Sequence, residues 1–91
     1  MKMPIVIYSK VNCSYCTKAK NLLNKLGLDY TEKKLEDFES TESFLKDIGK
    51  NVRAMPQIKI DGELIGGYNQ LVEYFADKGK VNFKGELIND G

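Results

Sequence analysis

The sequence predicts one α/β domain with the element order βαβαββα, in which helices flank a four-stranded mixed sheet. Apolar residues recur at helical spacing in three segments, and short apolar segments of strand length lie between them. Asp61-Gly62 is a two-residue hairpin signal, which predicts that the last two strands are antiparallel. A chain of 91 residues has room for one small core.

The two cysteines lie at the start of the first predicted helix, after the first strand and a loop. We expect a buried strand over residues 3–8, because Ile5-Val6-Ile7 is a continuous β-branched segment. Residues 9–12 are polar and predict a loop, and a helix follows over residues 14–26. Gly27 then suits a left-handed helix cap. The apolar stripe of this helix consists of Ala19, Leu22, Leu23 and Leu26.

A second strand and a second helix come next. The strand is expected over residues 28–35, parallel to the first and reached by a right-handed crossover. Residues 36–40 are acidic and polar, and we expect them to begin the helix, which ends at Gly49. Its apolar face consists of Phe44, Leu45 and Ile48.

The last elements are a hairpin and a helix. Strands are expected over residues 57–60 and 63–65, and Gly66-Gly67 separates them from a helix over residues 68–78. We expect the domain to span residues 1–78 and residues 79–91 to form a C-terminal extension, whose order the sequence does not decide. The helix buries Leu71, Val72, Tyr74 and Phe75, and the extension offers Val81, Phe83, Leu87 and Ile88 for packing.

Composition narrows the function classes. The apolar share is 42%, the charged share is 30%, and 14 basic and 13 acidic residues give a net charge of +1. This balance predicts neither nucleic-acid binding nor attraction to an anionic membrane. No segment has the length of a membrane span, and no signal peptide is recognised, so we expect a cytoplasmic location. Two cysteines in a reducing compartment predict redox chemistry or metal binding.

Cys13 and Cys16 are the strongest chemical signal. Residues three apart on a helix share a face, with Cβ atoms roughly 5–6 Å apart, so a reversible disulfide can form. Cys13 lies at the helix start, where unpaired N–H groups favour a thiolate, and Lys10 adds positive charge. We therefore expect Cys13 to be the nucleophile and Cys16, one turn further and less exposed, to be the resolving thiol.

Three other interpretations of the cysteine pair are weaker. A structural zinc site takes four ligands, whereas the chain has two cysteines and no histidine. An inert buried pair does not suit the helix-start position. A permanent disulfide does not suit a reducing compartment. The βαβ context favours redox catalysis.

Three motifs over residues 3–78 resemble the glutaredoxin family of the thioredoxin-like fold. They are Lys10 with Cys13-Ser14-Tyr15-Cys16, then Met55-Pro56-Gln57-Ile58, then residues 65–71 with the sequence IGGYNQL. The last two are especially similar to phage-encoded glutaredoxins. The resemblance implies a glutathione-dependent dithiol–disulfide oxidoreductase, with glutathione as reductant and co-substrate, that reduces protein disulfides and glutathione mixed disulfides.

The resemblance also implies contacts to glutathione near the cysteines. Lys10 would hold the glycyl carboxylate, and Tyr15 would flank the site. Pro56 would be a cis-proline facing the cysteines, and the backbone of Met55 would pair with the cysteinyl part.

Further glutathione contacts are implied at the two later helices. Gly67, Asn69 and Gln70 would lie near the γ-glutamyl end, at a helix N-terminus where anions bind. Lys46 matches the position of a family carboxylate contact.

Departures from the family pattern define the alternatives. Ser14 replaces the usual proline, and some relatives with serine there bind a two-iron cluster between subunits, so the alternative is an iron–sulfur carrier with Cys13 as ligand. We expect no resident metal or cluster. A thioredoxin-like electron donor is a further alternative, although the chain has no tryptophan. Expected partners of a monomer are glutathione and disulfide-containing proteins, with ribonucleotide reductase as the client by analogy.

Overall fold

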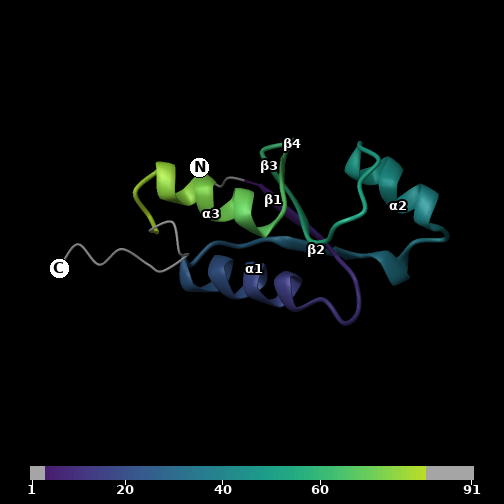
Figure 1. The fold of residues 1–91 in the computed structure, drawn as a ribbon, viewed down its shortest axis with the longest axis horizontal. Coiled ribbons are helices and arrows are strands. Elements are labelled where there is room, and N and C mark those ends of the chain that lie inside the picture. Colours follow the sequence, from purple (N-terminus) through teal and green to yellow (C-terminus); the bar gives the residue numbers. More distant parts are fainter. Residues whose placement is uncertain (1–3, 82–91) are drawn as a thin grey trace.

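The structure is a computed structural model that describes residues 4–81. Its elements follow the predicted βαβαββα order (Figure 1). They are β1 (Ile5–Ser9), α1 (Ser14–Lys25), β2 (Thr31–Lys34), the 3₁₀ turn η1 (Leu35–Asp37), α2 (Thr41–Ile48), β3 (Gln57–Ile60), β4 (Glu63–Gly66) and α3 (Tyr68–Asp77).

The four strands form one mixed sheet in the order β2-β1-β3-β4. β1 pairs with β2 in parallel and with β3 antiparallel, and β3 pairs antiparallel with β4. Asp61 and Gly62, which join β3 to β4, both have positive φ, as a tight hairpin turn of this kind requires. The predicted hairpin is therefore confirmed, and β1 lies in the interior of the sheet.

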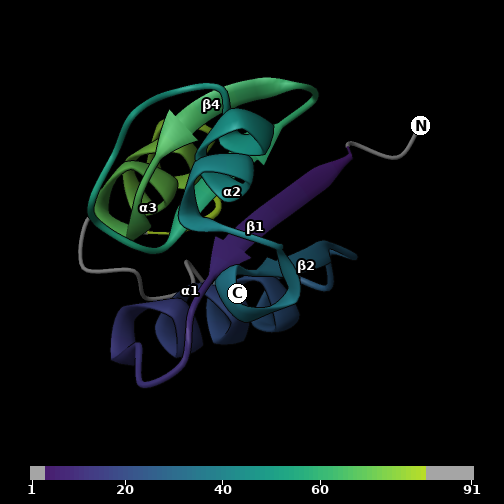
Figure 2. The same cartoon turned by 90° about the vertical axis from the view of Figure 1, so that its right-hand side faces the viewer.

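Helices cover both faces of the sheet. In Figure 1, α2 lies apart from α1 and α3, and in Figure 2, β1 runs between α1 and α2. The larger core joins the apolar stripes of α1 and α3 to β1 and β3, and the smaller core packs α2 against the other face. The buried residues of the larger core are Ile5, Ile7, Ala19, Leu22, Leu23, Ile58, Ile60, Leu71, Val72, Phe75 and Val81; those of the smaller core are Tyr8, Phe44 and Ile48.

The second strand is shorter than predicted. It covers Thr31–Lys34 rather than residues 28–35, because only these four residues pair with β1. The backbone N–H of Leu28 donates instead to the carbonyl of Leu23, 3.0 Å away, and so belongs to the end of α1. Leu35 begins the 3₁₀ turn.

The second helix begins later than predicted. Residues 36 and 37 belong to η1, Phe38 is extended, and α2 starts at Thr41. Ser40 fixes this start, because its hydroxyl accepts the N–H of Ser43 while the Ser43 hydroxyl accepts the N–H of Ser40. A reciprocal cap of this kind satisfies backbone donors at the start of a helix, which places the N-terminus of α2 at Ser40–Thr41.

The remaining differences are small. Ser9 pairs with Lys34 and so extends β1 beyond the predicted end, Gly66 extends β4, and α3 ends at Asp77. Met3, Phe83, Leu87 and Ile88 lie outside the described residues. Val81 is buried against the larger core, so packing continues past residue 78. Within residues 4–81, no helix has the length and apolar character needed to cross a bilayer.

Polar contacts centred on Asp47 fasten α2 to the sheet. The hydroxyl of buried Tyr8 donates toward Asp47, with its oxygen 2.8 Å from Oδ2 and 3.1 Å from the carbonyl oxygen. Lys33 Nζ lies 2.9 Å from Oδ2, and Lys59 Nζ donates to the Asp47 carbonyl at 2.8 Å. We call Tyr8, Lys33, Asp47 and Lys59 the Asp47 cluster.

Candidate active site

Cys13 occupies the N-cap of α1. Its backbone is extended, with φ −117° and ψ 99°, and its Sγ accepts the N–H of Cys16 at 3.2 Å. The first-turn N–H groups of a helix have no intrahelical acceptor, and they stabilise negative charge at this position. Cys13 is half-buried, so its sulfur is within reach of a second molecule. The position suits a thiolate nucleophile.

Cys16 lies one turn further along α1 and is only 2% exposed. It forms a disulfide with Cys13, and the two Cα atoms are 5.2 Å apart, within the range that a disulfide requires. The pair therefore shows the asymmetry expected from the sequence: one accessible cysteine at the helix start and one enclosed cysteine behind it.

The loop before β3 lies against Cys13. The Met55–Pro56 peptide bond is cis, which is the isomer that the family resemblance implies. The Met55 carbonyl oxygen is 3.6 Å from Cys13 Sγ, and Pro56 is buried. The Met55 carbonyl group thus flanks the Cys13 sulfur.

The start of α3 closes the other side of this loop. A Cβ at Gly67 would lie 3.2 Å from the Pro56 carbonyl oxygen, so only glycine fits without a shift. The Gly67 N–H donates to Gln70 Oε1 at 3.0 Å. A cavity of about 330 Å³, which we call the α3-side cavity, is lined by Lys50, Val52, Gln57, Leu64, Ile65, Gly66, Gly67 and Gln70.

Exposed apolar side chains flank the cysteines. Val11 is 63% exposed and Tyr15 is 53% exposed. The Tyr15 ring lies 5.9 Å from the ring of Tyr68, and Lys18 Nζ is 5.0 Å from its centre. Tyr15 therefore flanks the site on the surface rather than packing in the core.

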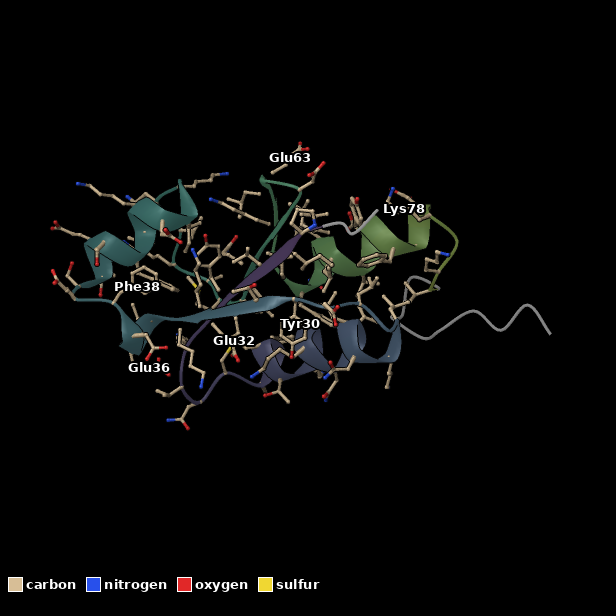
Figure 3. The ribbon with its side chains drawn as sticks, turned by 180° about the vertical axis from the view of Figure 1, so that it is seen from behind. Tyr30, Glu32, Glu36, Phe38, Glu63 and Lys78 are labelled. Carbon is tan, nitrogen blue, oxygen red and sulfur yellow. A yellow bond between two sulfur atoms is a disulfide. The ribbon has the colours of Figure 1, made fainter. Side chains whose placement is uncertain are left out.

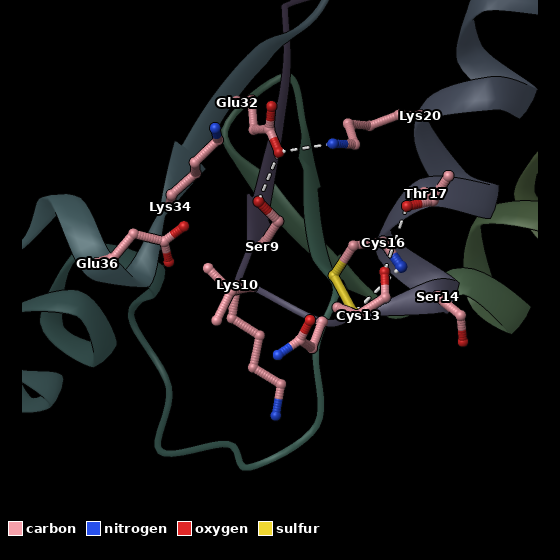
Figure 4. Close-up of a pocket in the computed structure, with 12 residues that line it drawn as sticks. Ser9, Lys10, Cys13, Ser14, Cys16, Thr17, Lys20, Glu32, Lys34 and Glu36 are labelled. Atoms are coloured by element: carbon pink, nitrogen blue, oxygen red, sulfur yellow. Dashed lines mark hydrogen bonds and ion pairs between the residues drawn. A yellow bond between two sulfur atoms is a disulfide. The ribbon is translucent and has the colours of Figure 1, made fainter.

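A second cavity, of about 540 Å³, opens beside the disulfide toward β2, and we call it the β2-side cavity (Figure 4). The lining includes both cysteines, Lys10, Lys34 and Glu36. It also includes three linked side chains, which we call the Glu32 network: Ser9 Oγ donates to Glu32 Oε2 at 2.7 Å, and Lys20 Nζ donates to the same oxygen at 3.0 Å.

The Glu32 carboxylate is ionised at neutral pH. Burial works to raise the pKa of Glu32, but the hydrogen bonds from Ser9 and Lys20 outweigh it and hold the pKa below its ordinary value. Figure 3 places Glu32 on the side of β2 that faces α1, the helix that carries Lys20. The network therefore places one negative and one positive charge beside the cysteine pair.

The proposed glutathione contacts do not share a single cavity. Lys10 lines the β2-side cavity, whereas Gly67 and Gln70 line the α3-side cavity. Lys46 lies on a third hollow, at the end of α2, together with Lys50. Asn69 is exposed in the first turn of α3.

Several side chains at the site were not found by sequence reasoning. Lys50 lines both the third hollow and the α3-side cavity. The sequence signal that could have found it is its position directly after Gly49, the glycine that ends the helix. Lys20 follows Cys16 by four residues, which places the two on one face of α1. Glu32 could be placed only once the register of β2 against β1 was known. Within residues 4–81, no group of three or more Cys, Asp and Glu side chains is arranged to hold a metal ion.

Comparisons with known proteins show which family this chain is similar to in sequence and in fold. The family model described as glutaredoxin matches residues 5–65. Glutaredoxin 1 of Rickettsia typhi is 43% identical over 76 residues, a match that covers 80% of this chain and 71% of the relative. Mitochondrial glutaredoxin-2 of Bos taurus is 38% identical over 65 residues, which cover 69% of this chain but only 41% of the relative.

Two solved structures show the same architecture. The buckwheat glutaredoxin–glutathione complex superposes with a TM-score of 0.70 at 30% identity, over 84% of this chain and 71% of that chain. Reduced Escherichia coli glutaredoxin also gives a TM-score of 0.70 at 30% identity, over 82% of this chain and 95% of that chain. The four-stranded sheet, its helices and the cysteine pair are thus similar to those of dithiol glutaredoxins.

Proposed function

The chain belongs to the glutaredoxin family, and we propose that it is a glutathione-dependent dithiol–disulfide oxidoreductase that acts through Cys13 and Cys16. The observation that carries the proposal is the asymmetric pair on α1: Cys13 at the N-cap beside the Met55 carbonyl, and Cys16 enclosed behind it. This arrangement gives the two sulfurs different tasks.

Cys13 begins the reaction in this proposal. Its thiolate attacks one sulfur of a substrate disulfide, a bond forms between Cys13 and that sulfur, and the other substrate sulfur leaves as a thiolate. The N-cap position supports the step, because the helix N–H groups stabilise the thiolate before attack.

The mixed disulfide is then resolved by one of two thiols. For a protein disulfide, Cys16 attacks Cys13 Sγ, the Cys13–Cys16 bond forms, and the second client thiol is released. Two molecules of glutathione then reduce the Cys13–Cys16 disulfide and leave as glutathione disulfide. For a glutathione mixed disulfide, a second glutathione attacks directly, so that Cys16 is not needed.

Glutathione contacts are assigned here as part of the proposal. The cysteinyl backbone pairs with Met55 beside Pro56, and the γ-glutamyl carboxylate lies at the N-terminus of α3, near Gly67 and Asn69. Support comes from the contact between the Gly67 backbone and Pro56, which keeps the two binding elements together.

Charged side chains supply the remaining contacts to glutathione. Lys10 is exposed beside Cys13 and suits the glycyl carboxylate, and Tyr15 flanks the bound tripeptide. Gln70 Oε1 accepts the Gly67 N–H in the structure. When glutathione binds, the Gln70 side chain turns from Gly67 to the ligand. Lys46 contacts a carboxylate of glutathione from the end of α2, and Lys50, which lines both the third hollow and the α3-side cavity, adds a second positive charge there.

The partners and the location follow from the chemistry. We propose that the domain of residues 1–78, with Val81 packed against its core, acts as a monomer in the cytoplasm, where glutathione keeps the pair reduced. Its proposed clients are proteins with a disulfide. Ribonucleotide reductase is the first client to test. Residues 79–91 are proposed as an extension of this domain that lies outside the catalytic steps.

The test is turnover of a small glutathione mixed disulfide by reduced glutathione, with glutathione reductase and NADPH reporting the rate. Wild type and Cys13→Ser are compared, and circular dichroism checks that both are folded. We expect steady turnover in wild type and none above background in Cys13→Ser. A folded, reduced wild-type protein without turnover would overturn the proposed electron donor, and thioredoxin reductase would then be tried as the source of electrons.

A further inference from the structure

The β2-side cavity holds a charged pair that the proposed reaction does not use. Cys16 and Lys20 both line it, and they are four residues apart on α1, which makes them neighbours on one helix face. A lysine at this place would by itself stabilise a Cys16 thiolate. Lys20 is not alone, however, because the Glu32 carboxylate lies 3.0 Å from its ammonium group.

The Lys20–Glu32 pair is held in place by further contacts. Glu32 accepts from Ser9, which is 2% exposed, as well as from Lys20, so its carboxylate is fixed from two elements. The side chains of Lys20 and Glu32 are themselves only 29% and 22% exposed, which weakens screening by solvent. Figure 4 shows both hydrogen bonds on the cavity wall above the disulfide.

We propose that Lys20 and Glu32 form a charge-balancing pair for the resolving cysteine. The Glu32 carboxylate compensates the Lys20 ammonium, so that Cys13 alone is activated and Cys16 stays a thiol until a mixed disulfide forms on Cys13. Lys20 and Glu32 are thus positioning residues that act through charge. The assignment rests on the proposed roles of the two cysteines.

The order of substrate attack and ring closure depends on Cys13 being ionised while Cys16 stays protonated. When Cys16 attacks Cys13 Sγ, its proton passes to solvent, the Cys13–Cys16 bond forms, and the bond from Cys13 Sγ to the substrate sulfur breaks. The substrate sulfur leaves as a thiolate and takes up a proton. A Cys16 that is ionised too early closes the ring with Cys13 before a second glutathione reacts. Keeping Cys16 protonated preserves both routes of turnover.

Other charged groups line the same cavity from neighbouring elements. Lys10 lies in the loop before α1, Lys34 lies on β2 and also lowers the pKa of Glu32, and Glu36 lies in η1. Glu36 has the same charge as Glu32 but makes no ion pair with Lys20 within residues 4–81, which makes Glu36→Gln a matched control.

The test measures the pKa of each cysteine in the reduced, full-length protein from the pH dependence of its Cβ chemical shift. Wild type is compared with Glu32→Gln, Lys20→Met, Glu36→Gln and the Glu32→Gln/Lys20→Met double variant. We expect Glu32→Gln to lower the pKa of Cys16 by about half a unit and Lys20→Met to raise it by a similar amount. The double variant is expected near wild type, and Glu36→Gln unchanged.

A rate measurement supplies a second readout. A fall of about half a unit in the pKa of Cys16 raises its thiolate fraction about threefold. A more acidic thiol is also a weaker nucleophile, which reduces the expected gain in rate to about twofold. We therefore expect Glu32→Gln to close the ring from the Cys13–glutathione mixed disulfide about twofold faster at pH 7.

Three results would overturn the proposal. They are an unchanged or raised pKa of Cys16 in Glu32→Gln, an equal shift in Glu36→Gln, and an unchanged or lowered pKa in Lys20→Met. The last decides the matter if Glu32→Gln fails to fold. The shifts need no turnover, so a protein that shows them but does not use glutathione would refute the proposed function and leave the charge balance standing.

Discussion

At the residue scale, the site depends on one close approach between two backbones. Gly67 has an ordinary φ of −94°, so alanine is allowed there by its backbone conformation. Its Cβ would nevertheless lie 3.2 Å from the Pro56 carbonyl oxygen, which forces the α3 N-terminus and the Met55 loop apart. The requirement for glycine thus comes from packing and not from a left-handed backbone.

We predict that Gly67→Ala weakens glutathione binding, because it separates the two elements that hold the tripeptide. A loss of about 1 kcal/mol corresponds to a rise of about fivefold in the KM for glutathione. Steady-state kinetics over a range of glutathione concentrations measures this change, and thermal unfolding shows whether the fold is intact. An unchanged KM in a folded variant would separate Gly67 from the glutathione site.

The lysines at the end of α2 give a second residue-scale prediction. Lys50 lines the α3-side cavity beside Gly67, whereas Lys46 lines only the neighbouring hollow. We expect Lys50→Ala to raise the KM for glutathione by up to about fivefold, since an ion pair made by an exposed lysine contributes at most about 1 kcal/mol. Lys46→Ala is measured beside it and should raise the KM less, because Lys46 does not line the α3-side cavity. A larger rise in Lys46→Ala than in Lys50→Ala would make Lys46 the main contact.

Some residues of the site could be predicted from the sequence alone, and others could not. Cys13 and Cys16 were found because their spacing and the helix start are both local signals. The contact between Met55 and Cys13 depended on the family resemblance, because 42 residues separate the two in the chain. Glu32 was missed, since no local pattern connects a charged residue on β2 with a lysine on α1.

At the scale of elements, α2 is held by polar contacts as well as by its apolar face. Phe44 and Ile48 pack in the smaller core, and the Asp47 cluster ties the helix end to three strands. Burial, with the hydrogen bond to Asp47, raises the pKa of Tyr8 well above its ordinary value, so its hydroxyl stays a donor. These contacts fix the helix that carries Lys46.

We predict that Asp47→Ala destabilises the protein by about 1 kcal/mol, the usual net contribution of a hydrogen bond. The loss is modest, because the Asp47 carbonyl still accepts from Lys59 and lies near Tyr8 in the variant. Urea unfolding measures the change. Asp47→Asn keeps an acceptor for Tyr8 and is expected to lose less stability than Asp47→Ala. Equal losses of stability in the two variants would assign the effect to the ion pair between Asp47 and Lys33.

The same carboxylate gives a pH prediction. A hydrogen bond from Lys33, then one from Tyr8, hold the pKa of Asp47 below its ordinary value, so its folded-state pKa lies below the unfolded one. Its contribution is therefore present above about pH 4 and is lost as the pH falls through the folded-state value. We expect the difference in unfolding free energy between wild type and Asp47→Ala to shrink from pH 6 to pH 3. A difference that stays constant would contradict the ion pair.

Element boundaries were predictable where the signal was local. The Asp61-Gly62 turn and the glycine at the end of α2 fixed their elements correctly. The start of α2 was misplaced, because acidic residues suit a first helical turn and the Ser40–Ser43 cap was not recognised. The length of β2 was misjudged, because it is set by its partner strand rather than by its own sequence.

At the scale of the whole molecule, the larger core extends beyond α3. Val81 is 1% exposed and packs with the apolar residues of α1, α3 and the sheet, three residues after the predicted domain boundary. The turn that brings it there is closed by the Lys80 N–H, which donates to the Phe75 carbonyl at 2.9 Å. The composition of residues 79–91 did not reveal this contact, because a single valine has no periodicity.

We predict that Val81→Ala costs about 2 kcal/mol of stability, from two lost methyl groups and the cavity that they leave. Val11→Ala is the control, since Val11 is exposed and its loss should change stability by less than about 0.5 kcal/mol. Chemical unfolding of both variants tests the difference. Equal stabilities would place Val81 outside the core.

Both proposed routes of turnover begin with Cys13 as the nucleophile. The most direct measurement incubates reduced Cys16→Ser and Cys13→Ser proteins with glutathione disulfide, stops the reaction with acid, and locates the bound glutathione by peptide mass spectrometry. We expect rapid and complete modification of Cys13 in Cys16→Ser, and slow modification of Cys16 in Cys13→Ser. Faster modification of Cys16 than of Cys13 would contradict this expectation.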